Sequence, residues 1–303
     1  MTHIKYSHMK TKILSGKEVS ASVYDDIKSR INLLLKRDIT PRLAVILIGD
    51  NPASEVYVNS KSKKFSELGL LSETIKLSKD VSESDVISKI EALNSNDEIH
   101  GILVQLPLPN HINSDNVIKT IKPHKDVDGF HPFNLGTLLT GKPEFVPCTP
   151  KGIMRILEYY QIDLSGLHVV VIGRSNIVGR PISVLTSLKN KYSNATTTLC
   201  HSGSKNMVQY LLDADVVILA LGSPEFLKKD HIKKDAIIID VGINRIIDPL
   251  NGKKKLVGDA DQKSLMGKAG AISPVPGGVG PMTIAMLVEN TIEAAEKSVD
   301  LSL

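Results

Sequence analysis

The sequence of 303 residues predicts an α/β protein with two domains. Two runs of consecutive apolar residues, 43–48 and 168–172, have the composition of parallel strands that are buried on both faces. Segments with helical periodicity accompany these runs, and this alternation is typical of layered α/β architectures. The chain is also long enough for two domains of ordinary size, each with its own hydrophobic core.

The composition limits the class of protein. An apolar fraction of 42% and a charged fraction of 23% are typical of a globular protein in water, and no apolar run approaches the roughly 20 residues that span a bilayer. Cys148 and Cys200 are too few for a disulfide framework or a zinc site, which predicts no metal and favours the reducing cytoplasm. The net charge of +4 is spread without a dense basic stripe, so we expect neither nucleic-acid nor membrane binding. Residues 1–12 are expected to form a frayed polar tail.

The first half of the chain is predicted to contain two helices and two strands. The helices are expected at residues 17–36 and from an N-cap at Ser54 to Gly69. The strand at residues 43–48 is followed by a second buried strand at residues 99–106. A stretch rich in Pro, Gly, Asp and His, residues 122–150, is interpreted as an ordered loop that crosses between the domains.

The second half is predicted to fold as a doubly wound nucleotide-binding domain. A helix at residues 150–160 leads to the strand at 168–172, and four more buried strands are expected at residues 197–200, 216–220, 237–241 and 256–258. Five strands with intervening helices match this architecture. Pro281 is expected at the first position of a final helix that runs to about residue 296.

A loop that contains glycine follows the strand at residues 168–172. Gly173 and Gly179 would allow the backbone to approach a pyrophosphate, whose charge is favoured at the N-terminus of the next helix. Ser175 replaces the second glycine of the usual Gly-x-Gly-x-x-Gly pattern. A tight turn that binds no ligand is therefore the alternative interpretation of this segment taken alone.

The choice between NAD and NADP can be argued from charge. In NAD-binding domains the second strand usually ends in an acidic residue that binds the ribose hydroxyls. Here that strand is followed by His201 and Ser202, without an acid. Arg174 lies in the phosphate loop, where its guanidinium could meet an added 2′-phosphate. The sequence therefore favours NADP.

A second set of polar residues follows the strands of the first half. Tyr57 and Lys61 share one face of the predicted helix. A lysine shielded from water there could exchange a proton, because burial lowers the pKa of an ammonium group. Gln105 lies near the end of the other strand and could hydrogen-bond Lys61 without keeping it protonated. The alternative is a surface lysine that lies over a half-buried tyrosine.

Two loops complete the set of candidate residues. Asp128 lies in a loop with a second acid, and a carboxylate that accepts two parallel N–H bonds suits the 2-amino-4-oxopyrimidine edge of a pterin. Pro276, Gly277 and Gly278 belong to a compact turn whose backbone could approach a flat ring. A solvated turn and a simple helix connector are the respective alternatives.

Together these segments resemble the bifunctional methylene-tetrahydrofolate dehydrogenase/methenyl-tetrahydrofolate cyclohydrolase family. They follow the family's order from about residue 13 to residue 297. The matching stretches are Gly49-Asp-Asn-Pro-Ala-Ser54, Tyr57-Val-Asn-Ser-Lys61, Gln105-Leu-Pro-Leu-Pro109, Lys125-Asp-Val-Asp-Gly129, Pro147-Cys-Thr-Pro150, Gly173-Arg-Ser175 with Val178-Gly179, and Pro276-Gly-Gly-Val-Gly-Pro-Met-Thr283.

The resemblance implies an enzyme of one-carbon metabolism. It would use NADP to oxidise 5,10-methylene-tetrahydrofolate and would then hydrolyse the methenyl product to 10-formyl-tetrahydrofolate. Lys61 would be the general acid/base, tuned by Tyr57 and Gln105, while Asp128 would hold the pterin. The residues implied to contact NADP are Gly173, Arg174, Ser175, Ser202 and Ile243, and those implied to contact the folate are Tyr57, Asp128, Pro276, Gly277 and Gly278.

The resemblance also implies the domain organisation. A three-layer catalytic domain would comprise residues 1–147 and a C-terminal helix at 281–303, and a Rossmann-like NADP-binding domain would comprise residues 148–280. A cleft would separate the two, and homodimers would form through the second domain. Two other interpretations stay open. A different Rossmann-type dehydrogenase, such as a shikimate-like enzyme, leaves Gln105 and Asp128 unexplained, and a non-catalytic nucleotide-binding protein would not need Lys61.

Overall fold

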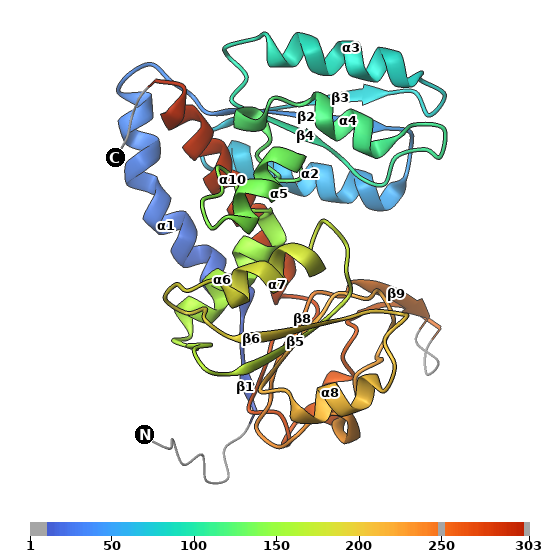
Figure 1. The fold of residues 1–303 in the computed structure, drawn as a ribbon. Coiled ribbons are helices and arrows are strands. Elements are labelled where there is room, and N and C mark those ends of the chain that lie inside the picture. The colour runs from blue at the N-terminus through green and yellow to red at the C-terminus, as the bar shows by residue number, and fades with distance from the viewer. Residues whose placement is uncertain (1–10, 248–251, 300–303) are drawn as a thin grey trace. The chain divides into compact units, whose positions relative to one another are not determined.

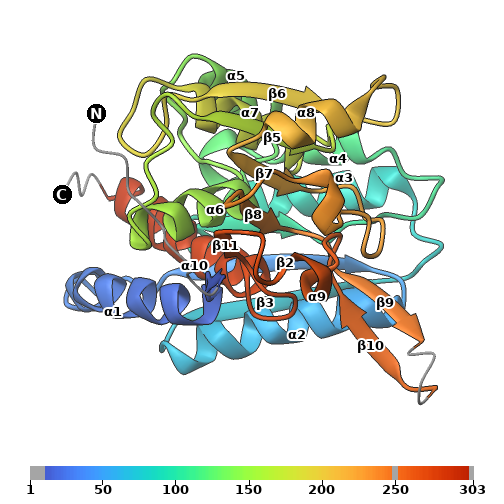
Figure 2. The same ribbon diagram turned by 90° about the horizontal axis from the view of Figure 1, so that it is seen from below.

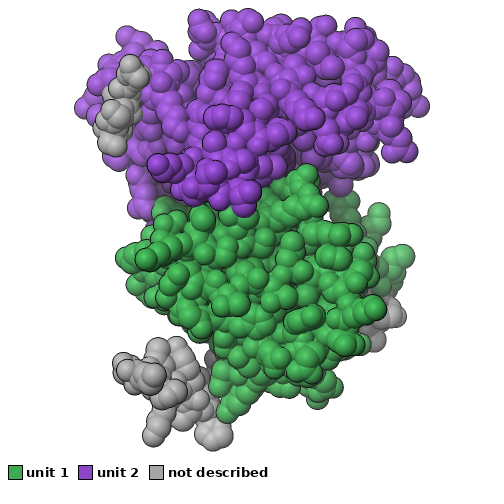
Figure 3. Space-filling model, viewed as in Figure 1, with its two compact units in different colours: residues 1–21, 149–283 green, residues 22–148, 284–303 purple. Residues whose placement is uncertain are grey.

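The structure, a computed structural model, describes residues 11–247 and 252–299. The chain divides into two compact units, which Figure 3 shows in different colours. Unit 1 comprises residues 1–21 and 149–283, and unit 2 comprises residues 22–148 and 284–303. Among the helices of the described ranges, none is long and apolar enough to cross a membrane.

Unit 2 is built on a three-stranded parallel sheet with the strand order β3-β2-β4. The strands are β2 (Arg42–Ile48), β3 (Leu71–Leu77) and β4 (Gly101–Val104). The central strand β2 is buried along almost its whole length, as its apolar run predicts. The edge strand β3 is partly exposed and carries Ser, Glu and Lys, so the apolar pattern did not reveal it.

Helices cover both faces of this sheet (Figure 1). Alternate residues of β2 pack in one hydrophobic cluster with α3 (Glu83–Asn94) and α4 (Ser114–Thr120). The helix α2 (Pro52–Glu67) lies on the opposite face. Two further helices, α1 (Gly16–Leu35) and α10 (Val279–Lys297), begin in unit 1 and continue in unit 2. The predicted three-layer α/β arrangement is confirmed.

Several boundaries predicted for unit 2 are wrong. Asn51 rather than Ser54 caps α2, because the Asn51 side chain accepts from the first N–H groups of the helix. The second buried strand is shorter than residues 99–106. The predicted loop at residues 122–150 contains a short 3-10 helix (Pro123–Lys125), the helix α5 (Pro132–Leu139) and the start of α6 (Cys148–Tyr159). Proline at the start of a helix accounts for the first two, since its fixed φ suits the first turn.

Unit 1 contains a six-stranded sheet in which all neighbouring strands are parallel. Four of its strands were predicted and two short ones were not. In spatial order they are β1 (Lys12–Ile13), β11 (Ala271–Ile272), β8 (Ile237–Asp240), β7 (Val216–Leu219), β5 (His168–Ile172) and β6 (Thr196–Cys200). The helices α7 (Gly179–Ser187) and α8 (Met207–Asp213) connect β5, β6 and β7. The doubly wound architecture is confirmed.

Three predictions for unit 1 are corrected. The strand expected at residues 256–258 is β10 (Lys254–Val257), which pairs antiparallel with β9 (Asn244–Ile247) instead of joining the main sheet. Figure 2 shows this hairpin projecting from the sheet. Pro281 is the third residue of α10 rather than the first. Of the predicted polar tail, residues 1–10 lie outside the described residues, and Lys12 belongs to β1.

Candidate active site

Lys61 is buried on α2, which follows the carboxyl end of β2. Only 8% of its surface is exposed, and its Nζ donates to Oε1 of Gln105 at 3.0 Å. Gln105 comes directly after β4, and its backbone N–H bonds Ile46 of β2 at 2.9 Å. Its amide nitrogen donates to the carbonyl of Leu106 at 2.7 Å, which turns the side-chain oxygen toward the lysine. The sheet therefore fixes a neutral acceptor opposite a buried amine.

The loop that follows the short 3-10 helix carries two acids with different surroundings. Asp126 is 1% exposed, and its Oδ2 accepts from the backbone N–H of His131 at 2.7 Å and from Nδ2 of Asn134 at 2.8 Å. Gly129 has a φ of +77°, and a Cβ there would lie 2.7 Å from the nitrogen of Pro147. Asp126 thus holds the loop together, which leaves Asp128 as the acid available for a substrate.

Charge links Asp128 to the buried lysine. Burial raises the pKa of the Asp128 carboxyl to about 6, against the opposing effects of Lys61 and of a hydrogen bond from Cys148. Burial lowers the pKa of Lys61, and electrostatic interactions with Asp128 and Cys148 oppose that shift. Lys61, Gln105 and Asp128 are thus brought together in unit 2, and the hydrogen bond expected between Lys61 and Gln105 is present. Tyr57 lies one turn before Lys61 on α2 and is 39% exposed.

Two residues beside this group were not predicted as site residues. Cys148 is buried, and its thiol donates to the carbonyl of Val127 at 3.3 Å. Asn290 of α10 is fully buried, and its Nδ2 donates to the carbonyls of Val127 at 2.8 Å and Val146 at 3.2 Å. A polar residue at a core position of an apolar helix is the sequence signal that could have revealed Asn290.

The predicted phosphate loop joins β5 to α7 in unit 1. A Cβ on Gly179 would lie 1.9 Å from the carbonyl oxygen of Gly173, so the turn can close only with glycine there. The hydroxyl of Ser175 accepts from the backbone N–H of Val178 at 3.1 Å and shapes the loop. The side chain of Arg174 is exposed. The loop thus lies at the carboxyl end of a parallel strand, where nucleotides bind in open α/β sheets.

The neighbouring strand ends carry the other residues predicted for the cofactor. Ser202 is exposed in the loop after β6, where Oγ of Ser204 accepts from the backbone N–H of His201 at 2.9 Å. Ile243 follows β8 and is 45% exposed. The turn with Pro276, Gly277 and Gly278 precedes α10 in unit 1, and a Cβ on Gly278 would lie 2.5 Å from the carbonyl oxygen of Pro274.

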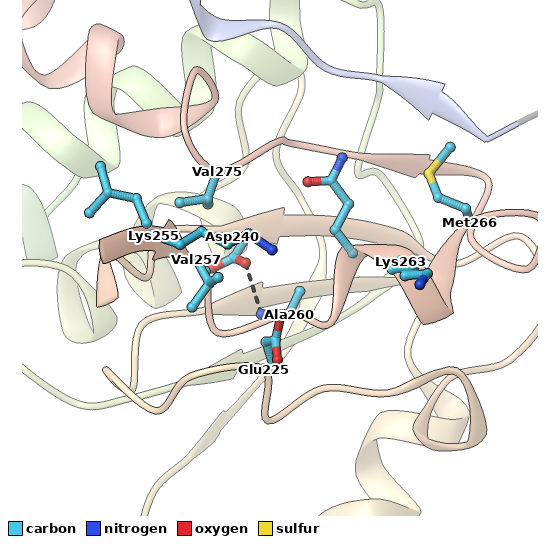
Figure 4. A pocket seen from close by; sticks show the side chains of 11 residues that line it. Glu225, Asp240, Lys255, Val257, Ala260, Lys263, Met266 and Val275 are labelled. Atoms are coloured by element: carbon cyan, nitrogen blue, oxygen red, sulfur yellow. Dashed lines mark hydrogen bonds between the residues drawn. The ribbon is translucent and has the colours of Figure 1, made fainter. Parts of the chain in front are cut away.

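A separate cavity of about 350 Å³ lies beside β10 and the short helix α9 (Gln262–Leu265) (Figure 4). Lys255 and Lys263 line it together with Glu225 and the buried Asp240. Its walls therefore differ from the loops that carry the predicted cofactor residues. Within the described ranges, no group of three or more His, Cys, Asp or Glu residues could hold a metal ion.

Comparison with known families assigns both halves of the chain. The family description "Tetrahydrofolate dehydrogenase/cyclohydrolase, catalytic domain" matches residues 14–128, and "Tetrahydrofolate dehydrogenase/cyclohydrolase, NAD(P)-binding domain" matches residues 147–299. The chain belongs to the tetrahydrofolate dehydrogenase/cyclohydrolase family. The resemblance based on the motifs is confirmed.

Relatives in this family match nearly the whole chain. The "Bifunctional protein FolD" of Geotalea daltonii is 48% identical over 286 residues, which cover 94% of this chain and 99% of the relative. The crystal structure of the bifunctional FolD from Campylobacter jejuni has a TM-score of 0.89 and 44% identity, and covers 95% of this chain and 99% of that chain. The FolD from Trypanosoma brucei, solved with NADP and an inhibitor, has a TM-score of 0.90 and 32% identity, and covers 96% and 99%.

The residues at the strand ends of unit 1 fit the NAD(P) cofactor of the family. The close approach at Gly179 leaves backbone rather than side chain at the helix N-terminus, which is the surface that binds a pyrophosphate. The exposed Arg174 follows β5 and the exposed Ser202 follows β6. The loop after β6 lacks the carboxylate that is typical of NAD sites. This donor set suits the additional phosphate of NADP.

Proposed function

We infer that this protein is a bifunctional enzyme of one-carbon folate metabolism. It oxidises 5,10-methylene-tetrahydrofolate with NADP and hydrolyses the resulting 5,10-methenyl-tetrahydrofolate to 10-formyl-tetrahydrofolate. Family membership over nearly the whole chain supports this function. The observation that carries it is the buried Lys61, whose amine donates a hydrogen bond to the neutral Gln105 and whose pKa depends on the nearby Asp128. Neither a shikimate-like dehydrogenase nor a non-catalytic binding protein accounts for this arrangement.

Lys61 is proposed as the group that moves protons. Its lowered pKa increases the fraction of neutral amine, which can take a proton from an attacking water. The ammonium form can then give a proton to the departing ring nitrogen. Gln105 accepts a hydrogen bond from either form and carries no charge, so it orients Nζ without fixing its protonation state. Tyr57, one turn earlier on α2, is proposed to orient the lysine and to contact the folate.

Asp128 is proposed to hold the pterin. Above a pH of about 6 its carboxyl is ionised and can accept two N–H bonds from the pterin edge. The backbone of Pro276, Gly277 and Gly278 is proposed to contact the flat rings of the substrate. When bound, NADP supplies the acceptor for the hydride that leaves the one-carbon bridge. The residues proposed to hold it are Gly173, Arg174, Ser175, Ser202 and Ile243.

The domain division follows from these roles. We propose that residues 22–147, with the C-terminal helix within 281–303, form the catalytic domain. Residues 148–280 are proposed to form the NADP-binding domain together with β1 (Lys12–Ile13), which the first-domain range 1–147 expected from the sequence had placed in the other domain although it belongs to the six-stranded sheet. The family matches to residues 14–128 and 147–299 support this division. The cytoplasm is the proposed compartment, because Cys148 and Cys200 are buried thiols rather than the halves of a disulfide.

A homodimer is proposed through the β9–β10 hairpin. Among the described residues this hairpin is a sheet of only two strands, so its outer edges have backbone groups available for pairing. Ile247 is 71% exposed and Leu256 is 38% exposed on it. A second copy of the chain would cover these two apolar side chains. Sedimentation should show a dimer for the wild type and a monomer for Ile247→Asp, whereas a monomeric wild type would refute the proposal.

The function can be tested by following each reaction separately. Enzyme mixed with NADP and methylene-tetrahydrofolate should produce NADPH, seen as a rise in its absorbance. Enzyme mixed with methenyl-tetrahydrofolate alone should remove the methenyl absorbance faster than buffer does. A folded preparation that catalyses neither reaction would contradict the proposed function, and one that catalyses only the first would contradict the bifunctional assignment.

A further inference from the structure

Two buried carboxylates lie next to each other at the carboxyl edge of the six-stranded sheet. Asp240 is the last residue of β8 and is 2% exposed, and Asp259 is fully buried. The backbone N–H of Asp259 donates to Oδ1 of Asp240 at 2.9 Å. Neither carboxylate belongs to the residues that the proposed reaction uses, so their presence in the interior requires another explanation.

Asp259 connects the segments that follow two different strands. Its Oδ2 accepts from the backbone N–H groups of Leu221 at 2.9 Å and Gly222 at 3.0 Å, just after β7. Its Oδ1 accepts from Nδ2 of Asn244 at 2.9 Å, four residues after the end of β8. One side chain therefore fixes the spacing between the loops after β7 and β8.

Asp240 holds the backbone around Asp259 in place through hydrogen bonds. Its Oδ1 also accepts from the backbone N–H of Gly242 at 2.9 Å. Its Oδ2 accepts from the backbone N–H of Ala260 at 2.8 Å, the bond drawn as a dashed line in Figure 4. The packing is tight, because a Cβ on Gly258 would lie 1.8 Å from Oδ2 of Asp240 and one on Gly242 would lie 2.3 Å from Oδ1 of Asp259. The two glycines leave the space in which the carboxylates reach these backbone donors.

The fixed loops lie where a nucleotide cofactor binds. In open α/β sheets, ligands bind outside the carboxyl ends of the parallel strands. The Asp259 carboxylate bonds the loop after β7 directly and, through Asn244, the segment that carries Ile243 after β8. A change in its hydrogen bonding would shift both loops.

We propose that Asp259 is a positioning residue for NADP, which holds the loops after β7 and β8 at the separation that the cofactor needs. It acts through Leu221, Gly222 and Asn244 rather than by contact with the cofactor. Asp240 orients it through the backbone. This inference rests on the proposed function only in requiring that NADP binds at this edge of the sheet.

The test compares Asp259→Leu with the wild type in two measurements. The first is the dissociation constant of NADPH, from its fluorescence on binding. The second is hydrolysis of methenyl-tetrahydrofolate without any nucleotide, which requires no redox partner. Removing the carboxylate leaves the backbone N–H groups of Leu221 and Gly222 without this acceptor. If holding the loops costs the free energy of about one hydrogen bond to a charged group, the dissociation constant should rise about tenfold. Hydrolysis should stay within about twofold of the wild type.

Asp259→Asn separates hydrogen bonding from charge. An asparagine there can keep its oxygen toward Leu221 and Gly222 while its amide nitrogen faces Asn244. The Asn244 amide can rotate so that its own oxygen accepts from the new donor. NADPH affinity should therefore stay close to the wild-type value in Asp259→Asn. Equal losses in the Asn and Leu variants would refute positioning through these hydrogen bonds.

Asp215→Asn is the matched control at the opposite edge of the same sheet. Asp215 precedes β7, and its carboxylate accepts from the backbone N–H of His168 at 2.8 Å and from Nζ of Lys233 at 2.5 Å. Its replacement should lower the melting temperature without changing NADPH affinity. If Asp259→Leu does not fold, Asn244→Leu can be used instead. It removes only the hydrogen bond between Asn244 and Asp259, and it should still weaken NADPH binding.

The outcomes distinguish this inference from the proposed function. A wild type that binds no NADPH would overturn both. A wild type that binds NADPH, with folded Asp259→Leu or Asn244→Leu of the same affinity, would overturn only the role of Asp259. Equal loss of NADPH binding and of hydrolysis in Asp259→Leu would mean general damage to the fold, and would also overturn it.

Discussion

Nζ of Lys61 lies 3.0 Å from Oε1 of Gln105, an acceptor that carries no charge. The pairing orients the lysine, whereas its charge state is set by burial and by electrostatic interactions with Asp128 and Cys148. An arrangement of this kind keeps both protonation states accessible. The first two predictions follow from it.

Replacing the lysine should separate the two reactions. Hydride departure from the methylene bridge is assisted by a ring nitrogen and needs no proton from the protein, whereas hydrolysis needs a base and an acid. Positioned acid–base groups contribute about 10²–10⁴-fold, so Lys61→Met should lower hydrolysis by at least that range and affect oxidation less. Lys63→Met is the control, because Lys63 lies on the same helix with 79% of its side chain exposed. Hydrolysis within tenfold of the wild type would exclude Lys61 as the proton carrier.

Replacing the amide by an acid should move the pH dependence. Gln105→Glu keeps the shape but places a carboxylate against Nζ, which favours the ammonium form and raises the pKa of Lys61. An opposite charge at this distance typically shifts a pKa by about 1–3 units. The limb of the hydrolysis profile that depends on the neutral amine should therefore move to higher pH. The rates should be measured across the pH range on both proteins, and an unchanged limb would argue against direct coupling.

Replacing Asp128 by asparagine should stabilise the fold but weaken folate binding. The pKa of Asp128 is raised to about 6, so the native state binds a proton more tightly than the unfolded chain does. Stability is consequently highest below the unfolded pKa and decreases as the pH rises toward 6. Asp128→Asn removes this penalty and should raise the melting temperature at pH 7.

The same Asp128→Asn variant should bind folate poorly, because its amide would place a donor against the N–H groups of a pterin bound as proposed. Both activities should then decrease together through a higher KM. In the wild type, the folate KM should rise as the pH falls through about 6, and this dependence should be absent from the variant. Unchanged folate affinity in Asp128→Asn would remove this residue from the substrate site.

Arg174 should determine the preference for NADP over NAD. Its loss would remove the charge-assisted contact proposed with the 2′-phosphate, so Arg174→Ala should raise the KM for NADP by about 10- to 150-fold and leave that for NAD nearly unchanged. Arg180→Ala is the control, since Arg180 lies in the first turn of α7 and bonds Oδ1 of Asn176 at 2.6 Å. Equal use of NAD and NADP by the wild type would contradict this interpretation of the loop.

The sequence predicted the parts of the fold that rest on local patterns. The apolar runs that became β2 and β5 are strands because both of their faces are buried, and composition alone reveals this. The edge strand β3 is partly exposed and mixes polar with apolar residues, so it lacked that signal. The start of α2 was misplaced because Asn51 and Ser54 are both suitable caps, and only the hydrogen bonds show which one is used.

The candidate site was predictable only where function requires a recognisable residue type. Lys61, Gln105 and Asp128 lie in recognisable motifs after strands, but the contact of Asn290 with Val127 joins residues 163 positions apart. The bonds of Asp259 to Leu221 span 38 positions in the same way. No periodicity specifies such a pair, because the partner is a backbone carbonyl or N–H that every residue possesses.

Asn290 provides the last prediction, because it ties together the two segments beside Asp128. Its amide bonds the carbonyl of Val127, the residue before Asp128, and that of Val146, two residues before Cys148. Asn290→Leu keeps a similar volume but removes two hydrogen bonds to buried carbonyls, which costs about 1–3 kcal/mol of stability. The loop should also shift, so the KM for folate should rise in both reactions while the NADPH dissociation constant stays unchanged.

The control for Asn290 is its neighbour on the same helix. Thr291 is fully buried, and its hydroxyl donates to the carbonyl of Leu287, one turn earlier on α10, at 2.8 Å. Thr291→Val should therefore lower the melting temperature slightly without affecting either KM. Both variants should be assayed well below their melting temperatures, so that loss of folded protein does not mimic loss of affinity. A normal folate KM in Asn290→Leu would show that the loop holds Asp128 in place without this amide, and the contact would then be structural only.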